Sequence, residues 1–128
     1  MPQCDFDALQ DQLVDFAVRI IQLVGRLPET AAARHISVQI LASGTSPAAN
    51  YGEARGAESR ADFIHKLRVA LKELNETAIW LLMIMKAGMA PAALITDALN
   101  ENRQLSRILN ASAKTAQSTR NSNRLIDH

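Results

Sequence analysis

Hydrophobic side chains recur every three or four residues along most of the chain, which is the period of an amphipathic α-helix. Short stretches that hold glycine or proline separate the periodic segments. The pattern therefore predicts four helices, over residues 7–26, 29–56, 59–87 and 92–117. Helices joined by short connections pack as antiparallel neighbours, so the predicted fold is all-α, an up-down-up-down four-helix bundle in one domain over residues 1–117.

The third predicted helix organises the others. Ser59 suits its N-cap, with Asp62 three residues later as the acidic partner of a capping box, and Gly88 suits a left-handed C-cap. One stripe of this helix is apolar and is predicted to face the core. Its members are Phe63, Leu67, Ala70, Leu71, Leu74, Ala78, Leu81 and Met85.

The opposite side of the same helix is also partly apolar, and residues 78–85 are apolar without a break. A helix segment that is apolar on every side must be covered. We therefore predict that a second copy of the chain covers this side and that Val69, Trp80 and Ile84 form the oligomer interface. The alternative is that long side chains of the same bundle shield Trp80.

The second predicted helix contains Gly44 and Pro47, which both disfavour a helix interior. The periodic pattern nevertheless resumes through Tyr51 and Ala54 without a phase break. We predict a kinked but continuous helix, because nearby hydroxyl groups can bond back to the carbonyls of the preceding turn. These hydroxyls belong to Ser43, Thr45 and Ser46.

A second face of this helix carries small side chains, at Val38, Ala42, Thr45 and Ala49. Small side chains let another helix approach closely, because little volume separates the two backbones. The pattern therefore favours close packing on this face.

The composition supports a helical bundle, with 48% hydrophobic but only 4% aromatic residues. No apolar run reaches the ~20 residues of a membrane span, and the start of the chain has neither the basic residues nor the apolar stretch of a signal peptide. We expect a cytoplasmic protein with no membrane partner. Cys4 is the only cysteine, which excludes an internal disulfide.

The net charge is only +1, but the charges are unevenly distributed. Residues 1–18 contain aspartates and no Lys or Arg, whereas the charged residues among 103–128 are mostly basic. Because the predicted topology places the start of the first helix beside the end of the fourth, we expect these two regions to neutralise each other. Residues 118–128 are rich in Ser, Asn and Arg, and we expect a disordered polar tail there.

No constellation of reactive side chains stands out. None of the three histidines follows a glutamate at the three-residue spacing of di-iron bundles. Glu73 and Glu76 are neighbouring carboxylates without an imidazole partner, and we interpret them as solvated or paired with Lys66 and Lys72. We therefore predict a protein that is not an enzyme, with no catalytic residue, metal, cofactor or small-molecule substrate.

The segment TSPAANYGEARGAESRADFIHKLRVALKELNETAIWLLMI, residues 45–84, resembles the family of four-helix-bundle proteins related to those encoded in 23S rRNA intervening sequences. The resemblance implies an up-down bundle that assembles into a ring-shaped homopentamer. The family includes accessory proteins of diversity-generating retroelements, which are basic and associate with nucleic acid and a reverse transcriptase, and most of its members have no assigned activity. The residues that match the family signature are Asn50, Glu53, Lys72, Glu73, Glu76, Thr77, Trp80 and Leu81.

Two functions from different classes are compatible with this sequence. The leading hypothesis is a non-enzymatic, self-associating scaffold or interaction protein, a homopentamer by resemblance. In this interpretation Asn50 and Glu53 are structural and satisfy polar groups across the second and third helices. The neighbouring genes would discriminate this scaffold hypothesis from the second one, an accessory subunit, because a neighbouring gene for a reverse transcriptase would favour the accessory role.

The alternative is an accessory subunit that binds RNA or DNA. Its candidate contacts lie on the fourth helix and beyond, at Arg107, Lys114, Arg120 and Arg124. Affinity for phosphates comes mainly from clustered Lys and Arg, but the turn after the second helix mixes Arg55 and Arg60 with three carboxylates. We therefore expect nucleic-acid binding to be weak or absent.

Overall fold

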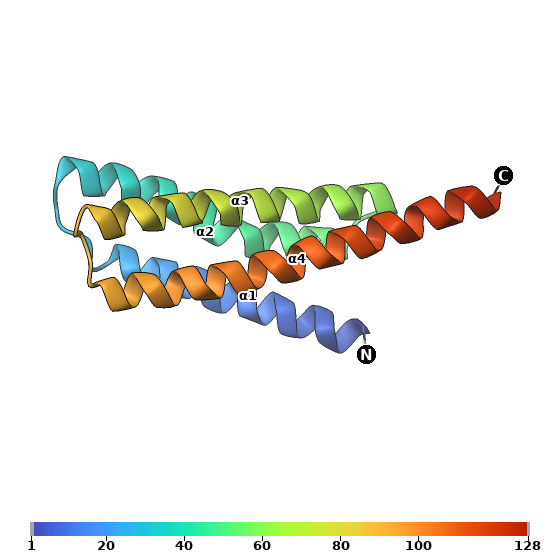
Figure 1. The fold of residues 1–128 in the computed structure, drawn as a ribbon, viewed down its shortest axis with the longest axis horizontal. Coiled ribbons are helices and arrows are strands. Elements are labelled where there is room, and N and C mark those ends of the chain that lie inside the picture. The colour runs from blue at the N-terminus through green and yellow to red at the C-terminus, as the bar shows by residue number, and fades with distance from the viewer. Residues whose placement is uncertain (1, 128) are drawn as a thin grey trace.

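The computed structural model describes the backbone of residues 2–127 and the side chains of residues 6–119 and 121. Within residues 2–127 it contains four helices and no strand, so the predicted all-α, four-helix architecture is confirmed (Figure 1). The helices are α1 (Pro2–Val24), α2 (Ala31–Arg55), α3 (Arg60–Lys86) and α4 (Ala92–Asp127).

The ends of α3 carry both predicted caps. The hydroxyl of Ser59 accepts a hydrogen bond from the Asp62 amide at 3.0 Å, which satisfies a free donor of the first turn. At the other end Gly88 adopts a left-handed conformation, with φ 68°, and the Met89 amide donates to the Ile84 carbonyl at 3.1 Å. This bond across the glycine is typical of a Schellman C-cap.

Helix α2 starts later than predicted. Its N-cap is Thr30, whose side chain accepts from the Ala33 amide at 3.2 Å, and the helix begins at Ala31 rather than at residue 29. A hydroxyl that satisfies a first-turn amide outweighs the preference of Pro28 for a first helical position. In its first turn Ala33 is buried and Ala32 is exposed.

Helix α2 is continuous through Pro47, as predicted. The hydroxyls of Thr45 and Ser46 donate to the carbonyls of Leu41 and Ala42, each at 2.6 Å. Proline has no amide hydrogen, so Pro47 leaves the Ser43 carbonyl without its helical donor, and the two back-bonds add donors to the carbonyls just before it. The bend that we expected at this point stays a prediction.

Each helix packs mainly on its neighbour in sequence, and α1 meets α4 over a smaller part of its length. Helix α2 approaches α1 closely at Gly44, where an added Cβ would lie 2.9 Å from a side-chain carbon of Ile20. The predicted inward stripes supply most of the core. Its largest fully buried side chains are Leu13, Phe16, Ile20, Ile40, Tyr51, Leu67, Leu74, Leu81, Ile84, Ile95, Leu105 and Leu109.

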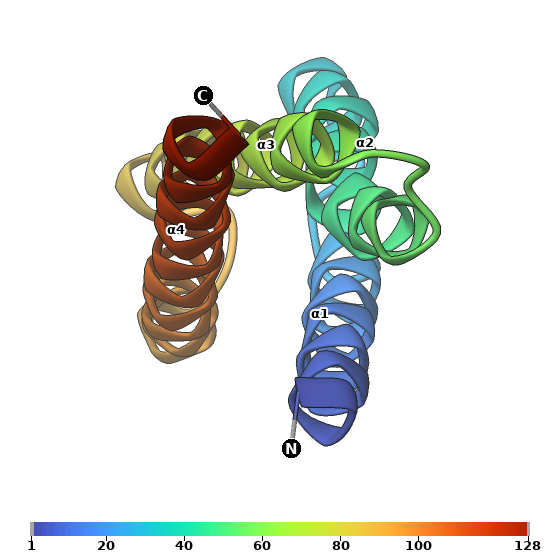
Figure 2. The same cartoon turned by 90° about the vertical axis from the view of Figure 1, so that its right-hand side faces the viewer.

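Helices α1 and α4 diverge toward the chain termini (Figures 1 and 2). The predicted neutralisation of the acidic start of α1 by the basic end of α4 is therefore wrong. Asp7 instead forms an ion pair with Arg55, at the end of α2. The two helices are joined nearer the opposite end of the bundle, where Arg19 in the last two turns of α1 pairs with Glu101 in the first three turns of α4 at 3.3 Å.

Helix α4 continues to Asp127, where we expected it to end at residue 117 and a disordered tail to follow. Local hydrogen bonds accompany the extension. The Thr119 hydroxyl donates to the Thr115 carbonyl at 3.0 Å, and the Gln117 amide donates to the Asn121 side chain at 3.2 Å. Polar residues one turn apart thus support a helix that needs no apolar stripe.

Candidate functional site

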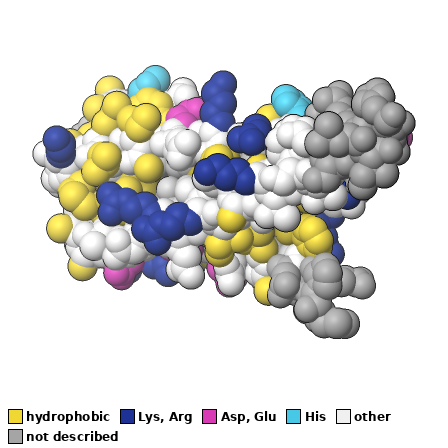
Figure 3. Space-filling model, turned by 45° about the vertical axis from the view of Figure 1, so that its right-hand side comes forward, with side chains coloured by type: hydrophobic (Ala, Val, Ile, Leu, Met, Phe, Trp, Pro, Cys, Tyr) yellow, Lys and Arg dark blue, Asp and Glu magenta, His cyan; other side chains and the backbone are white. Residues whose placement is uncertain are grey.

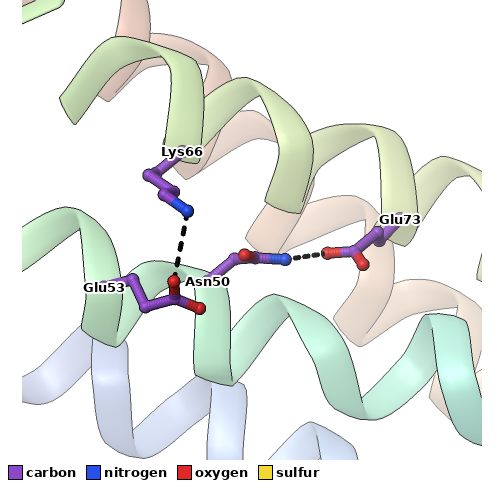
Figure 4. Close-up of polar contacts among 4 residues, drawn as sticks. All are labelled: Asn50, Glu53, Lys66 and Glu73. Carbon is purple, nitrogen blue, oxygen red and sulfur yellow. Dashed lines mark hydrogen bonds and ion pairs between the residues drawn. The ribbon is translucent and has the colours of Figure 1, made fainter. Parts of the chain in front are cut away.

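A polar seam joins α2 to α3 on the side of the bundle that these two helices share. The Asn50 side-chain amide donates to Glu73 at 2.7 Å, and Lys66 pairs with Glu53 at 3.1 Å (Figure 4). Each contact takes one residue from α2 and one from α3. The side chains of Asn50 and Glu53 thus both bond from α2 to α3, as expected if these residues are structural.

Glu73 is the most electrostatically perturbed member of the seam. Its partial burial raises the pKa of the carboxyl group above the usual range, since burial penalises the charged form. Hydrogen bonds from Asn50 and Ser46 act in the opposite direction, and the neighbouring charge of Glu76 raises the pKa further. The effect of burial on the pKa of Glu73 thus outweighs that of the two hydrogen bonds, both from α2, which favour the charged form.

Beneath the seam, Thr77 and Ser43 are both buried, and their hydroxyl oxygens lie 2.8 Å apart. The Thr77 hydroxyl is also 2.8 Å from the Glu73 carbonyl. Because a hydroxyl carries a single hydrogen and a carbonyl can only accept, Thr77 donates to the carbonyl and accepts from Ser43. Both hydroxyls are then satisfied inside the core.

The side of α3 that we assigned to a second copy is largely covered by α2. Ile84 has no exposed surface, so this member of the predicted interface is a core residue. Val69 and Trp80 are half-buried, and the Trp80 indole donates to Glu76 at 3.1 Å and meets the His35 ring edge-on. The physical reason is that α3 packs against both α2 and α4, so two of its sides are covered within the chain.

The residues that match the family signature thus lie on α2 and α3. Asn50, Glu53 and Glu73 belong to the seam, and Thr77 lies beneath it. Lys72 is exposed and contacts no carboxylate among the described residues.

Large apolar side chains are exposed in two other places on the bundle. Each of these residues keeps between 39% and 65% of its surface accessible. The first, here called the α1–α2 apolar face, combines a stripe on α1 with the small-residue face of α2. Its members are Val14, Val18, Ile21, Val38, Ala42 and Ala49. The small residues of α2 were predicted from the sequence as a separate face, whereas the exposed stripe on α1 was missed. The spacing of Val14, Val18 and Ile21 by four and three residues was the available signal.

The second place, here called the α3 apolar face, lies near the end of α3 and consists of Ile79, Leu82 and Met83. Lys86 follows one turn later on the same side, and Lys72 lies two turns before Ile79. The unbroken apolar run of residues 78–85 was a signal for this face, but the sequence could not say which of its sides the bundle leaves open.

Exposed cations lie on the outer side of α3 and α4. Arg103, Arg107 and Lys114 recur at four and seven residues along α4, and none forms an ion pair among the described residues. On α4, Asn102 donates to the carbonyl of Leu74 on α3, so these two residues lie at the same level of the bundle. Because the two helices are antiparallel, Arg68, six residues before Leu74, lies level with Arg107, five residues after Asn102. Figure 3 shows Lys and Arg side chains spread over this side with few Asp or Glu among them. The side chains of Arg120 and Arg124, the other predicted contacts, lie outside the described residues.

The described residues contain no group of three or more His, Cys, Asp or Glu able to hold a metal ion. No helix within this part of the chain is long and apolar enough to cross a membrane. A hollow of about 540 Å³ between α1 and α4 is lined by Arg19, Gln22, Arg26 and apolar residues of both helices. These lining residues do not pair an acid with a base or a nucleophile, so they suggest no reaction.

Comparison with known proteins agrees with this architecture. The family model described as 23S rRNA-intervening sequence protein matches residues 7–111. The chain is also similar to a solved structure from Bacteroides thetaiotaomicron, described as a protein with unknown function from the S23 ribosomal protein family. That match has 38% sequence identity and a TM-score of 0.80, and covers 85% of this chain and 97% of the other.

The search of curated proteins gave no match. The matched range of the family model spans α2 and α3 completely, together with most of α1 and about half of α4. It therefore includes the polar seam, the buried hydroxyl pair and both apolar faces. The chain belongs to the 23S rRNA-intervening sequence protein family.

Proposed function

We propose that the protein is a non-enzymatic scaffold that works by self-association, as a ring of identical bundles. The observation that carries the proposal is the pair of exposed apolar faces, one on α1 and α2 and the other on α3. Soluble monomers seldom leave grouped large apolar side chains in water, and such groups mark contact surfaces. The resemblance noted from the sequence favours five copies in the ring.

The polar seam supports this role indirectly. Its pairs fix α3 against α2, and the buried hydroxyls of Ser43 and Thr77 tie the two helices together below it. Polar groups that find partners only in one register make the packing of two helices specific. The two apolar faces are then held at a fixed angle to each other, which a closed ring requires.

Light scattering behind a sizing column tests the self-association. We expect a mass several times that of the 14.0 kDa chain at micromolar concentration. The variant Val18→Asp should give a smaller species with unchanged helix content, because a charge cannot be buried cheaply in an apolar contact. Gln104→Asp, at an exposed position of α4 outside both faces, is the matched control and should keep the wild-type mass. A wild-type monomer would contradict the proposal.

The second candidate function is an accessory subunit that binds nucleic acid, and the exposed cations of α3 and α4 favour it. Arg103, Arg107 and Lys114 are not neutralised by carboxylates among the described residues. Clustered cations release counterions from a phosphate chain, which is the main source of non-specific affinity. The net charge of only +1 argues for weak binding.

Titration of labelled single-stranded and duplex RNA and DNA discriminates the two functions. The scaffold hypothesis predicts dissociation constants of roughly 10⁻⁴ to 10⁻⁶ M near physiological salt. Sub-micromolar binding with a steep salt dependence, lost in Arg103→Glu with Arg107→Glu and kept in the control Arg34→Glu, would establish the accessory role instead.

A further inference from the structure

We infer that the contact between copies is heterologous, with the α3 apolar face of one copy packed on the α1–α2 apolar face of the next. This inference rests on the proposed self-association and specifies its geometry. It follows from where the two faces lie, from the shapes of their side chains and from the charges beside them.

The two faces belong to different sides of the molecule. Figure 2 shows α1 and α2 together on one side and α4 on the other, with the later part of α3 beside α4. Ile79, Leu82 and Met83 lie in that later part of α3. A symmetric dimer formed through either face would leave the other face in water in both copies. A heterologous contact covers both faces of every copy, and a heterologous contact whose rotation closes produces a ring.

The side chains of the two faces are complementary in size. On α2 the α1–α2 apolar face has Ala42 and Ala49, two of the smallest side chains, near the larger Val38. The α3 apolar face presents Leu82 and Met83, which are long and, in the case of Met83, flexible. Long side chains that enter the space above alanines give close packing, whereas two copies of the same small-residue face would interdigitate less.

The charges in excess beside the two faces have opposite sign. Asp11 and Asp15 are exposed on α1, one on either side of Val14 in the sequence, and neither forms an ion pair among the described residues. Lys72 and Lys86 bracket the α3 apolar face and are likewise exposed and without an ion pair in that part of the chain. One exposed charge of the other sign lies a turn from each face, Arg34 before Val38 and Glu76 before Ile79, and the two aspartates and the two lysines outnumber them. Opposite charges around an apolar contact favour the contact between unlike faces and disfavour each face meeting itself.

A complementation experiment tests the geometry. One variant carries Val18→Asp and Ile21→Asp, which disable the α1–α2 apolar face, and the other carries Leu82→Asp and Met83→Asp, which disable the α3 apolar face. All four positions are exposed in the single chain, so both variants should fold, and circular dichroism checks this. We expect each variant alone to be a monomer and an equimolar mixture to form a dimer containing one copy of each, because the mixture retains one intact face of each kind.

A symmetric contact gives a different result. One variant alone would then remain a dimer, and mixing would form no dimer of the two kinds, which would overturn the inference. If the wild-type chain is an oligomer but the mixture stays monomeric, the heterologous contact is also overturned while the proposed self-association stands. A monomeric wild type would overturn both.

Charge reversal gives an independent test. Lys72→Glu with Lys86→Glu should weaken self-association by at least about tenfold, and adding Asp11→Lys with Asp15→Lys should restore it, because the attraction is re-created with exchanged signs. The control Asp97→Lys changes an exposed charge of α4 outside both faces and should leave association unchanged. Failure of the second pair to rescue the first in a folded protein would contradict the assigned contact.

Discussion

The hydroxyl of Thr77 on α3 accepts a hydrogen bond from the hydroxyl of Ser43 on α2, at an oxygen separation of 2.8 Å inside the core. Thr77→Val keeps the side-chain shape but removes the hydroxyl, which leaves Ser43 buried without this partner. We expect the free energy of unfolding in urea to fall by about 1–3 kcal/mol, the cost of an unsatisfied buried hydroxyl.

Two further variants make this test specific. Thr77→Ser retains the hydroxyl and should lose less stability than Thr77→Val. The double variant with Ser43→Ala removes both polar groups, so its loss should be smaller than the sum of the two single losses. Strict additivity would show that the two hydroxyls are not coupled.

Gly44 is predicted to resist substitution. An added Cβ would lie 2.9 Å from Ile20, a β-branched and fully buried side chain. Overpacking a core costs about 1–3 kcal/mol, whereas alanine in place of glycine gains about 1 kcal/mol of helix propensity. The free energy of unfolding of Gly44→Ala should therefore fall by on the order of 1 kcal/mol. Gly52→Ala, where the nearest atom is the flexible end of Gln10 at 3.4 Å, is the matched control and should gain stability. A higher melting temperature for Gly44→Ala would contradict the close approach of α2 to α1.

The raised pKa of Glu73 predicts a pH dependence of stability. Because the folded state holds this proton more firmly than the unfolded chain, its contribution is present below the ordinary glutamate pKa of about 4.3 and is lost as the pH rises through the folded-state pKa. Glu73→Gln removes this titration and keeps an oxygen that can accept from Asn50. The variant should therefore be more stable than wild type at pH 7, and the difference should shrink below pH 4.

Urea unfolding at several pH values measures this effect. Glu58→Gln, at an exposed position before α3, serves as the control for removing a negative charge from the same region. An advantage of Glu73→Gln that is the same at every pH would show that burial of its charge is not the cause.

Asn50 is predicted to be a structural residue. Asn50→Ala removes the 2.7 Å hydrogen bond to Glu73 and should lower the melting temperature, with a loss of about 1 kcal/mol because the contact is only partly buried. It should also raise the pKa of Glu73 further, since that hydrogen bond acts to lower it. Asn75→Ala, exposed on α3, is the control and should cause no loss. Unchanged stability of Asn50→Ala would free this residue for another role.

Local features of the chain were predictable from the sequence. The caps at Ser59 and Gly88 depend on residues within one turn of a helix end, and the inward stripes depend on a period of three to four residues, so both can be identified without a structure. The continuity of α2 through Pro47 was predictable for the same reason, because the periodic pattern and the hydroxyls that bond back to carbonyls of the preceding turn lie close to the proline in the sequence.

Features that depend on how the helices are placed were not predictable. Periodicity shows that the side of α3 carrying Ile84 is apolar, but it cannot show that α2 rather than another copy covers that side. The divergence of α1 and α4 likewise depends on crossing angles, which arise from the fit of side chains between helices. The pairing of Asp7 with Arg55, in place of the basic end of α4, is a consequence of that geometry.

Native mass spectrometry of the wild-type chain tests the central claim, self-association into a closed ring, most directly. We predict one dominant species with five times the 14.0 kDa mass of the chain, unchanged over a tenfold dilution in the micromolar range. A closed ring has no free ends, so it should show no ladder of successively larger species. A spectrum dominated by the single chain under these conditions would contradict the account.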